Sequence, residues 1–275
     1  MMPVEVLATE EADRTGTTPL YRGYAFDLDG TLYLGDDLIE GADTVVATLR
    51  GFGSRVVFVT NKPLETAENY AAKLTKLGIP ATADDVISAL DALSLYLTGR
   101  HPGARILAVG EPVLIDSLRS AGFTVTENPA ETDVVVVSFD RTFDYDKLTR
   151  AYQAVNAGAV IVATNPDPYC PTPDGGLPDC AAMLAAIEAC TGGRAEAIVG
   201  KPSAHMANAF LHRLGVPANE AVMVGDRLLT DVAMGLNAGM ASVLVMSGAT
   251  THDHLAASTI HPTHVLDDVR GLIAA

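Results

Sequence analysis

The sequence predicts an α/β fold, in which a doubly wound parallel sheet carries a second, inserted α/β unit. Short Val- and Ile-rich runs alternate with helical periodicities after residue 20. Such alternation is typical of parallel sheets that are covered by helices on both faces. A length of 275 residues also favours two domains, or one large domain with an insertion.

Eight apolar runs are the expected strands. They lie at 22–29, 55–60, 105–110, 133–139, 159–164, 195–200, 221–225 and 241–246. Three of the stretches between them have apolar residues at helical spacing and end in glycine, which commonly follows a helix. These expected helices lie at 64–78, 145–158 and 203–215.

The composition excludes several classes of partner. A formal net charge of −16 disfavours both nucleic acid and anionic membrane surfaces as partners. No apolar run approaches the roughly 20 residues that a membrane helix needs. The first 20 residues show neither periodicity nor the basic and apolar regions of a signal peptide. We therefore expect a cytoplasmic protein with a loosely ordered N-terminal extension.

Polar side chains follow four of the expected strands. They are Asp27 and Asp29, then Thr60 and Asn61, then Lys201, and finally Asp226 with Asp231 after it. Ligands of open α/β sheets bind outside the carboxyl ends of the strands. A single sheet gathers all four groups if residues 88–195 are an inserted domain and residues 18–87 and 196–275 form the core. The Pro- and Gly-rich stretch 166–179 within the insertion is expected to be a functional loop.

Each of these groups also has a simpler interpretation. Asp27 and Asp29 lie on one side of a strand, where two acids are costly unless paired or bound to a cation, but Asp-Gly turns are common at strand ends. The simpler interpretation of Lys201 is an exposed lysine in a loop. That of Asp231 is an acid in the first turn of a helix, where the helix dipole favours it. Thr60 and Asn61 are otherwise helix caps. Residues 162–165 repeat their pattern, and the sequence does not decide which of the two serves a site.

Together, the polar groups at the strand ends favour one class of chemistry. Carboxylates of the kind supplied by Asp27, Asp29 and Asp226 suit Mg²⁺, a hard cation that prefers oxygen ligands. Lys201 and the Thr60 hydroxyl are able to hold phosphate oxygens. One acid is able to act as a nucleophile while the other transfers protons.

Four motifs in order resemble those of the haloacid dehalogenase superfamily. They are FDLDGTLY (26–33), VFVTN (57–61), VGKPS (199–203) and VGDRLLTD (224–231). With TNPD at 164–167 and MSGATT at 246–251, the chain resembles the NagD-like, nitrophenylphosphatase-like class IIA branch. The resemblance implies a Rossmann-like core, an inserted α/β cap domain that closes over the site, and pairing of two copies through their caps.

The resemblance also implies roles for the motif residues. Asp27 would be the nucleophile, and Asp29 the general acid and base. Thr60 and Asn61 would contact the transferring phosphoryl group. Lys201 would steady that group and Asp27. The Mg²⁺ ligands would be Asp27, the main-chain carbonyl of Asp29 and Asp226, with Asp231 supporting the site.

Two departures from this pattern bear on the substrate. Lys62 and Pro63 replace the Asn or Ser that often follows the Thr-Asn pair, so that Lys62 either favours a more anionic substrate or points to solvent. One interpretation of Asp179 is that, together with Tyr169, it contacts the hydroxyls of a sugar or polyol phosphate. The other is that Asp179 caps a helix.

A small phosphate monoester is therefore the expected substrate. The low aromatic content of 5% gives no evident platform for stacking a base, which favours sugar or polyol phosphates. Nucleoside monophosphates and pyridoxal phosphate stay open as alternatives, as does a non-catalytic regulator that binds a phosphate ligand.

Overall fold

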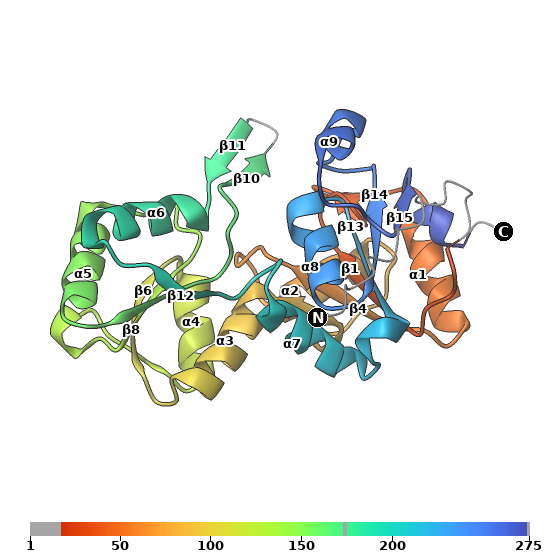
Figure 1. The fold of residues 1–275 in the computed structure, drawn as a ribbon. Coiled ribbons are helices and arrows are strands. Elements are labelled where there is room, and N and C mark those ends of the chain that lie inside the picture. The colour runs from red at the N-terminus through yellow and green to blue at the C-terminus, as the bar shows by residue number, and fades with distance from the viewer. Residues whose placement is uncertain (1–17, 173–174, 274–275) are drawn as a thin grey trace, which may run out of the picture.

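A computed structural model describes residues 18–172 and 175–273, and it consists of two α/β bodies that lie side by side (Figure 1). The predicted α/β class with parallel sheets is confirmed. Residues 1–17 of the expected N-terminal extension lie outside the described residues. No helix in the described part of the chain has the length and apolar character needed to cross a membrane.

The first body is built on a six-stranded parallel sheet. From edge to edge it consists of β15 (His264–Leu266), β14 (Ala241–Val245), β13 (Ala221–Gly225), β1 (Gly23–Asp27), β4 (Arg55–Thr60) and β5 (Val86–Ser88). The central strand β1 is buried along its whole length. Apolar residues on both sides of a strand are typical of a sheet that is covered on two faces.

Helices cover both faces of this sheet. Tyr24 and Phe26 of β1 pack in one apolar cluster with α1 (Ala42–Gly51) and α2 (Ala67–Lys76). Ala25 packs in the other cluster, which holds side chains of the helices on the opposite face. Those helices are α3 (Ala89–Arg100), α7 (Ala204–Leu214) and α8 (Ala233–Asn237). The sheet is therefore doubly wound.

A five-stranded parallel sheet forms the second body. Its order is β12 (Ala195–Ile198), β9 (Val160–Ala163), β8 (Val134–Val137), β6 (Arg105–Val109) and β7 (Thr124–Val125). Its helices are α4 (Pro112–Ser120), α5 (Tyr145–Asn156) and α6 (Cys180–Thr191). The apolar cluster of α3 and α7 also includes Val134 and Val136 of β8. One apolar cluster therefore extends across both bodies.

The strand before Lys201 lies elsewhere than expected. We predicted that residues 195–200 would join the sheet of Asp27, but β12 pairs with β9 at the edge of the second sheet. The chain returns to the first body only after Ile198. Lys201 consequently enters the site from a connection between the bodies, and the single-sheet explanation of the four strand ends is wrong for this group.

Smaller elements complete the fold. The predicted functional loop at 166–179 contains an antiparallel hairpin of β10 (Tyr169–Thr172) and β11 (Gly175–Pro178), which projects from the second body (Figure 1). A second short hairpin, β2 (Tyr33–Leu34) with β3 (Asp37–Leu38), follows β1. A short helix, α9 (His252–Ala257), lies between β14 and β15.

Candidate active site

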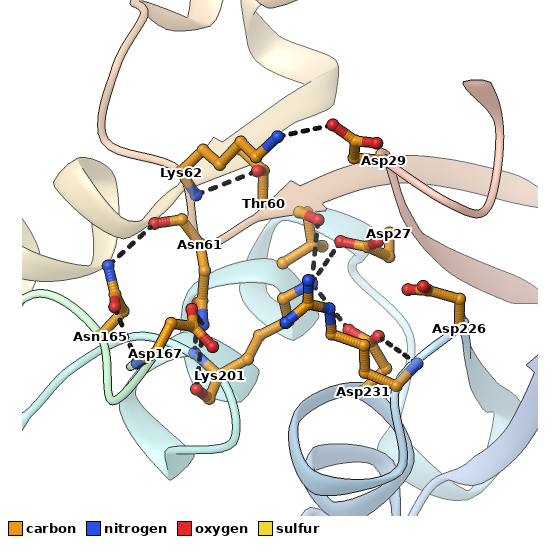
Figure 2. Close-up of polar contacts among 12 residues, drawn as sticks. Asp27, Asp29, Thr60, Asn61, Lys62, Asn165, Asp167, Lys201, Asp226 and Asp231 are labelled. Carbon is orange, nitrogen blue, oxygen red and sulfur yellow. Dashed lines mark hydrogen bonds and ion pairs between the residues drawn. The ribbon is translucent and has the colours of Figure 1, made fainter. Parts of the chain in front are cut away.

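Asp27, Lys201 and Asp231 form a buried ionic group. Lys201 Nζ donates to Asp27 Oδ1 and also to Asp231 Oδ1, the latter at 2.7 Å (Figure 2). The side chains of Lys201, Asp27 and Asp231 are 4%, 11% and 1% exposed. Asp27 is the last residue of β1, and Asp231 lies in a single π-helical turn, η4 (Leu228–Val232), where we expected an ordinary first helical turn.

Burial and mutual attraction set the ionisation of this group. Burial raises the pKa of Asp27 to about 6, against the lowering effect of Lys201. Burial also raises the pKa of Asp231, again opposed by Lys201. For Lys201, burial lowers the pKa, but Asp231 and Asp27 outweigh it and raise the pKa overall. The two carboxylates thus favour the charged form of Lys201, and Lys201 favours the ionised form of Asp27, the form in which a carboxylate is able to act as a nucleophile.

Asp226 follows β13 and faces this group. Its Oδ2 accepts the Ala249 N–H at 2.5 Å, whereas its Oδ1 is buried without a hydrogen-bond partner among the described residues. A Cβ atom on Gly248 would lie 2.1 Å from Asp226 Oδ2, and one on Gly30 would lie 2.5 Å from it. These two glycines therefore leave the space that the carboxylate occupies. Burial raises the pKa of Asp226 to about 6, with a further contribution from Asp27.

The carboxylates fit a divalent cation. Asp27, Asp226 and Asp231 each offer an oxygen, and these oxygens lie within 4.8 Å of one another. A buried carboxylate oxygen without a partner costs free energy, and a bound cation removes that cost. Hard oxygen donors of this kind are the ligands that Mg²⁺ prefers. Asp29 is outside this side-chain cluster.

Asn61 contacts the main chain of Lys201 through both ends of its amide. Its Oδ1 accepts the Lys201 N–H at 2.7 Å, and its Nδ2 donates to the Lys201 carbonyl at 3.1 Å and to Asp167 Oδ2 at 2.9 Å (Figure 2). A Cβ atom on Gly200 would lie 2.6 Å from Asn61 Oδ1, so glycine allows this close approach. Both amide protons are engaged, and the contact between Asn61 and a phosphoryl group stays a prediction. Any contact from Asn61 has to come from its main chain.

The first of the two similar Thr-Asn patterns lines the cavity, and the second supports it. Thr60 faces the cavity with Asp27. Thr164, in contrast, is buried in the second body, where its hydroxyl donates to Ser138 at 3.1 Å. Asn165 donates to the Asn61 carbonyl at 3.4 Å. The repeated pattern thus sits on both sides of the junction between the two bodies.

Lys62 does not point to solvent. Its Nζ donates to Asp29 Oδ2 at 2.5 Å, and these two side chains are 30% and 35% exposed (Figure 2). Burial lowers the pKa of Lys62, but its bond to Asp29 more than compensates and raises the pKa overall. The positive charge that Lys62 adds to the site is therefore paired with the motif residue Asp29.

The predicted site residues other than Asp231 line one cavity of about 300 Å³ between the two bodies. Those at its wall are Asp27, Asp29, Thr60, Asn61, Lys62, Tyr169, Asp179, Lys201 and Asp226. Asp179 is also the N-cap of α6 and accepts the Cys180 N–H at 2.6 Å. Burial raises the pKa of Asp179 to about 6. Helix capping by Asp179 is therefore confirmed, and it coexists with a place in the cavity wall.

Comparisons with known proteins identify the family of this chain. The family model for haloacid dehalogenase-like hydrolases matches residues 24–124, and a related HAD-hydrolase-like model matches residues 198–272. The sugar-phosphatase AraL of Bacillus subtilis is 36% identical over 248 residues, which cover 90% of each chain. This chain is a haloacid dehalogenase-like hydrolase. The predicted family is thereby confirmed.

Two further relatives of this haloacid dehalogenase-like hydrolase have different names. The 5'-nucleotidase YutF of Bacillus subtilis is 34% identical over 249 residues, or 90% of this chain and 96% of that protein. The crystal structure of a 4-nitrophenylphosphatase from Thermotoga maritima aligns with a TM-score of 0.86 and 34% identity, covering 90% of this chain and 95% of that one.

Several cavity residues of the hydrolase lay outside our sequence prediction. They are Gly30, Leu34, Asp167, Cys170, Arg227, Thr230, Ser247, Gly248 and Ala249. Arg227 directly follows the predicted ligand Asp226, and its main-chain N–H donates to Asp231 Oδ2 at 3.1 Å. Burial lowers the pKa of Arg227, but Asp226 and Asp167 outweigh burial and raise it. Adjacency to a motif acid was the signal that could have revealed this cation.

Proposed function

We propose that this hydrolase cleaves small phosphate monoesters by transferring the phosphoryl group to Asp27, with Mg²⁺ as its cofactor. The observation that carries the proposal is the buried Asp27 carboxylate, which is paired with Lys201 and lies within 4.8 Å of a carboxylate oxygen of Asp226. A carboxylate in such a place is a suitable nucleophile, since it splits one difficult transfer into two easier ones. The similar proteins named as sugar-phosphatase, 5'-nucleotidase and nitrophenylphosphatase support the same reaction class.

In the first step, an Asp27 oxygen attacks the phosphorus of the ester. The bond from phosphorus to the alcohol oxygen breaks, and its electron pair stays on that oxygen. Asp29 gives its proton to the departing alcohol, which leaves as the neutral molecule. The product bound to the enzyme is an aspartyl-phosphate on Asp27.

In the second step, Asp29 acts as a base. It takes a proton from a water molecule as the water oxygen attacks the phosphorus. The bond between phosphorus and the Asp27 oxygen breaks, which regenerates the carboxylate and releases inorganic phosphate. Asp29 ends the cycle protonated, as it began.

Cationic groups stabilise the negative charge in both steps. Lys201 holds Asp27 in place and is able to meet a phosphoryl oxygen, and the Thr60 hydroxyl is available for another. Asp27, Asp226 and the Asp29 main-chain carbonyl would hold Mg²⁺, with Asp231 as support. When bound, the cation would offset the charge of the carboxylates and polarise the phosphoryl group.

The wall contributed by the second body favours a hydroxylated leaving group. Asp167, Asp179 and Tyr169 line the cavity opposite the core motifs, and all three are able to bond to hydroxyls. We therefore propose a sugar or polyol phosphate as the preferred substrate. The similarity to a 5'-nucleotidase makes nucleoside monophosphates the second candidate, since Tyr169 is also able to stack on a base.

Phosphate release from a panel of esters tests these proposals. The panel holds sugar, polyol, nucleoside and pyridoxal phosphates together with 4-nitrophenyl phosphate, each with Mg²⁺ and with a chelator. We expect Mg²⁺-dependent turnover that Asp27→Asn abolishes, with a sugar or polyol phosphate ranked first. Binding without turnover of any ester would favour the regulator, and turnover that survives Asp27→Asn would assign the nucleophile elsewhere.

A further inference from the structure

The Lys62 side chain links the second motif to Asp29 across the mouth of the cavity. Its Nζ contacts Asp29 Oδ2 at 2.5 Å, and both residues belong to the cavity wall. The contact uses one of the two carboxylate oxygens. The carboxyl group is thus held from one side, and Asp29 also lines the cavity.

The main chain of Lys62 is fixed on both sides. Its N–H donates to Thr60 Oγ1 at 3.1 Å, and its carbonyl accepts the Tyr70 hydroxyl at 3.0 Å. Tyr70 is buried in the core of the first body, and Pro63 follows directly in the chain. Proline restricts its own φ and the conformation of the residue before it. The Lys62 side chain therefore starts from a rigid point.

Stability alone does not account for this arrangement. Both charged side chains are about one-third exposed, at 30% and 35%. Ion pairs with such exposure contribute little, about 0–1 kcal/mol. A rigid anchor that aims a lysine at one particular carboxylate, inside the cavity that holds the reactive group, fits a role in the reaction.

We propose that Lys62 is a positioning residue: its ammonium bonds Asp29 Oδ2 and leaves the other carboxyl oxygen to carry the proton that goes to the departing alcohol. This inference rests on the function proposed above, in which Asp29 is the general acid. A free aspartate side chain samples several staggered rotamers. Holding the acid in one of them raises the fraction of encounters in which the proton reaches the alcohol oxygen.

The leaving group provides a direct test. An alkyl alkoxide needs a proton as it departs, whereas 4-nitrophenolate is stable enough to leave without one. In the enzyme with Mg²⁺, we expect Lys62→Met to lower kcat/KM for glycerol phosphate by about 10- to 100-fold, less than the roughly 100- to 10,000-fold of general acid catalysis, because Asp29 itself is still present. With 4-nitrophenyl phosphate we expect a loss of less than about 3-fold. Lys62→Arg, which keeps a cation able to bond the carboxylate, should restore most of the activity toward glycerol phosphate.

Two further variants separate the possible outcomes. Lys73→Met is the matched control, because Lys73 also pairs with an aspartate, Asp36, at 3.4 Å, but lies outside the cavity wall. It should leave both substrates unaffected. Asp29→Asn should show the same selective loss as Lys62→Met, only larger.

Each result with these variants has one meaning. In one combination, Asp29→Asn loses activity selectively toward glycerol phosphate while Lys62→Met loses activity equally on both substrates or loses none. That combination overturns the role of Lys62 and leaves the role of Asp29 standing. No selectivity in Asp29→Asn overturns the assignment of Asp29, and with it the inference for Lys62. Activity of Lys62→Met toward 4-nitrophenyl phosphate also reports that the variant is folded.

Discussion

Asn61 positions Lys201 without touching its ammonium group. The Asn61 amide binds the Lys201 main chain through an accepted bond of 2.7 Å and a donated bond of 3.1 Å. Its remaining proton goes to Asp167 of the second body at 2.9 Å. Since the Lys201 side chain in turn holds Asp27, the proposed nucleophile, one amide ties the partner of Asp27 to both bodies of the protein.

Asn61→Ala should therefore lower turnover more than substrate binding. We expect kcat to fall by about 100-fold with a small change in KM, because the Lys201 loop loses its anchor. The free energy of unfolding should fall by about 1–3 kcal/mol, the cost of leaving buried main-chain groups unsatisfied. Steady-state kinetics and urea unfolding measure the two effects.

A matched control for this variant lies on α2. Asn69 donates to Glu65 at 2.6 Å on an exposed surface, so Asn69→Ala should change neither quantity appreciably. A rise in KM with an unchanged kcat in Asn61→Ala would contradict the anchoring role. That result would instead mean that the side chain binds the substrate.

The strands were predictable because each is a short apolar run with clear ends. All eight predicted strands form, among them β1, which carries Asp27 at its last position. The partner of a strand is not encoded in the same way. β12 has the composition of any half-buried strand, and only its packing against β9 decides which sheet it joins. The short strands β5, β7 and β15 were missed, because two or three residues are too few for a period to be read.

The site was predictable where main-chain position alone determines a side chain's place. Asp27 and Asp226 end their strands, so they meet at one edge of the sheet. The contacts of long or bifunctional side chains were not predictable in this way. Lys62 has four rotatable bonds, and its pairing with Asp29 depends on where the next turn places each residue. The bonds from the Asn61 amide to the Lys201 main chain were not predictable either, because nothing in the local sequence shows that Lys201 lies against this amide.

Mg²⁺ should stabilise the protein through Asp226. At a free concentration 100 times its dissociation constant, a ligand that binds only the folded state adds about 2.7 kcal/mol to the free energy of unfolding. Asp226→Asn replaces a carboxylate oxygen that has no hydrogen-bond partner in the described part of the chain, so the variant should lose most of this gain. Thermal unfolding with and without Mg²⁺ measures the effect for both proteins. Equal stabilisation of both would place the cation elsewhere.

The buried carboxyl of Asp179 should make stability depend on pH. Its folded-state pKa is raised to about 6, mainly by burial, above the roughly 3.9 of an unfolded chain. The folded state then binds the proton more tightly, so its contribution is fully present below about pH 4 and is lost as the pH rises through 6. Asp179→Asn lacks this titration. Relative to the wild type it should gain about 1–3 kcal/mol between pH 4 and pH 8.

Urea unfolding at several pH values, with a chelator present, compares the two proteins. The chelator removes any contribution from a cation bound at Asp226. A difference between the wild type and Asp179→Asn that stays constant from pH 4 to pH 8 would contradict the raised pKa.

Asp179 has two candidate roles, one as the cap of a helix and one as a contact for substrate hydroxyls. It caps α6 through the Cys180 N–H and lines the cavity opposite Lys62. Asparagine is about as good an N-cap as aspartate, whereas alanine costs about 1 kcal/mol.

If Asp179 accepts bonds from substrate hydroxyls, both Asp179→Asn and Asp179→Ala should lower kcat/KM for the preferred sugar or polyol phosphate. We expect a loss of about 10-fold relative to 4-nitrophenyl phosphate, which has no hydroxyls to contact Asp179. If Asp179 only caps the helix, Asp179→Ala should lose stability, and the order of preferred substrates should stay unchanged in both variants. Kinetics on the ester panel, with unfolding of the same samples, therefore separates recognition from capping.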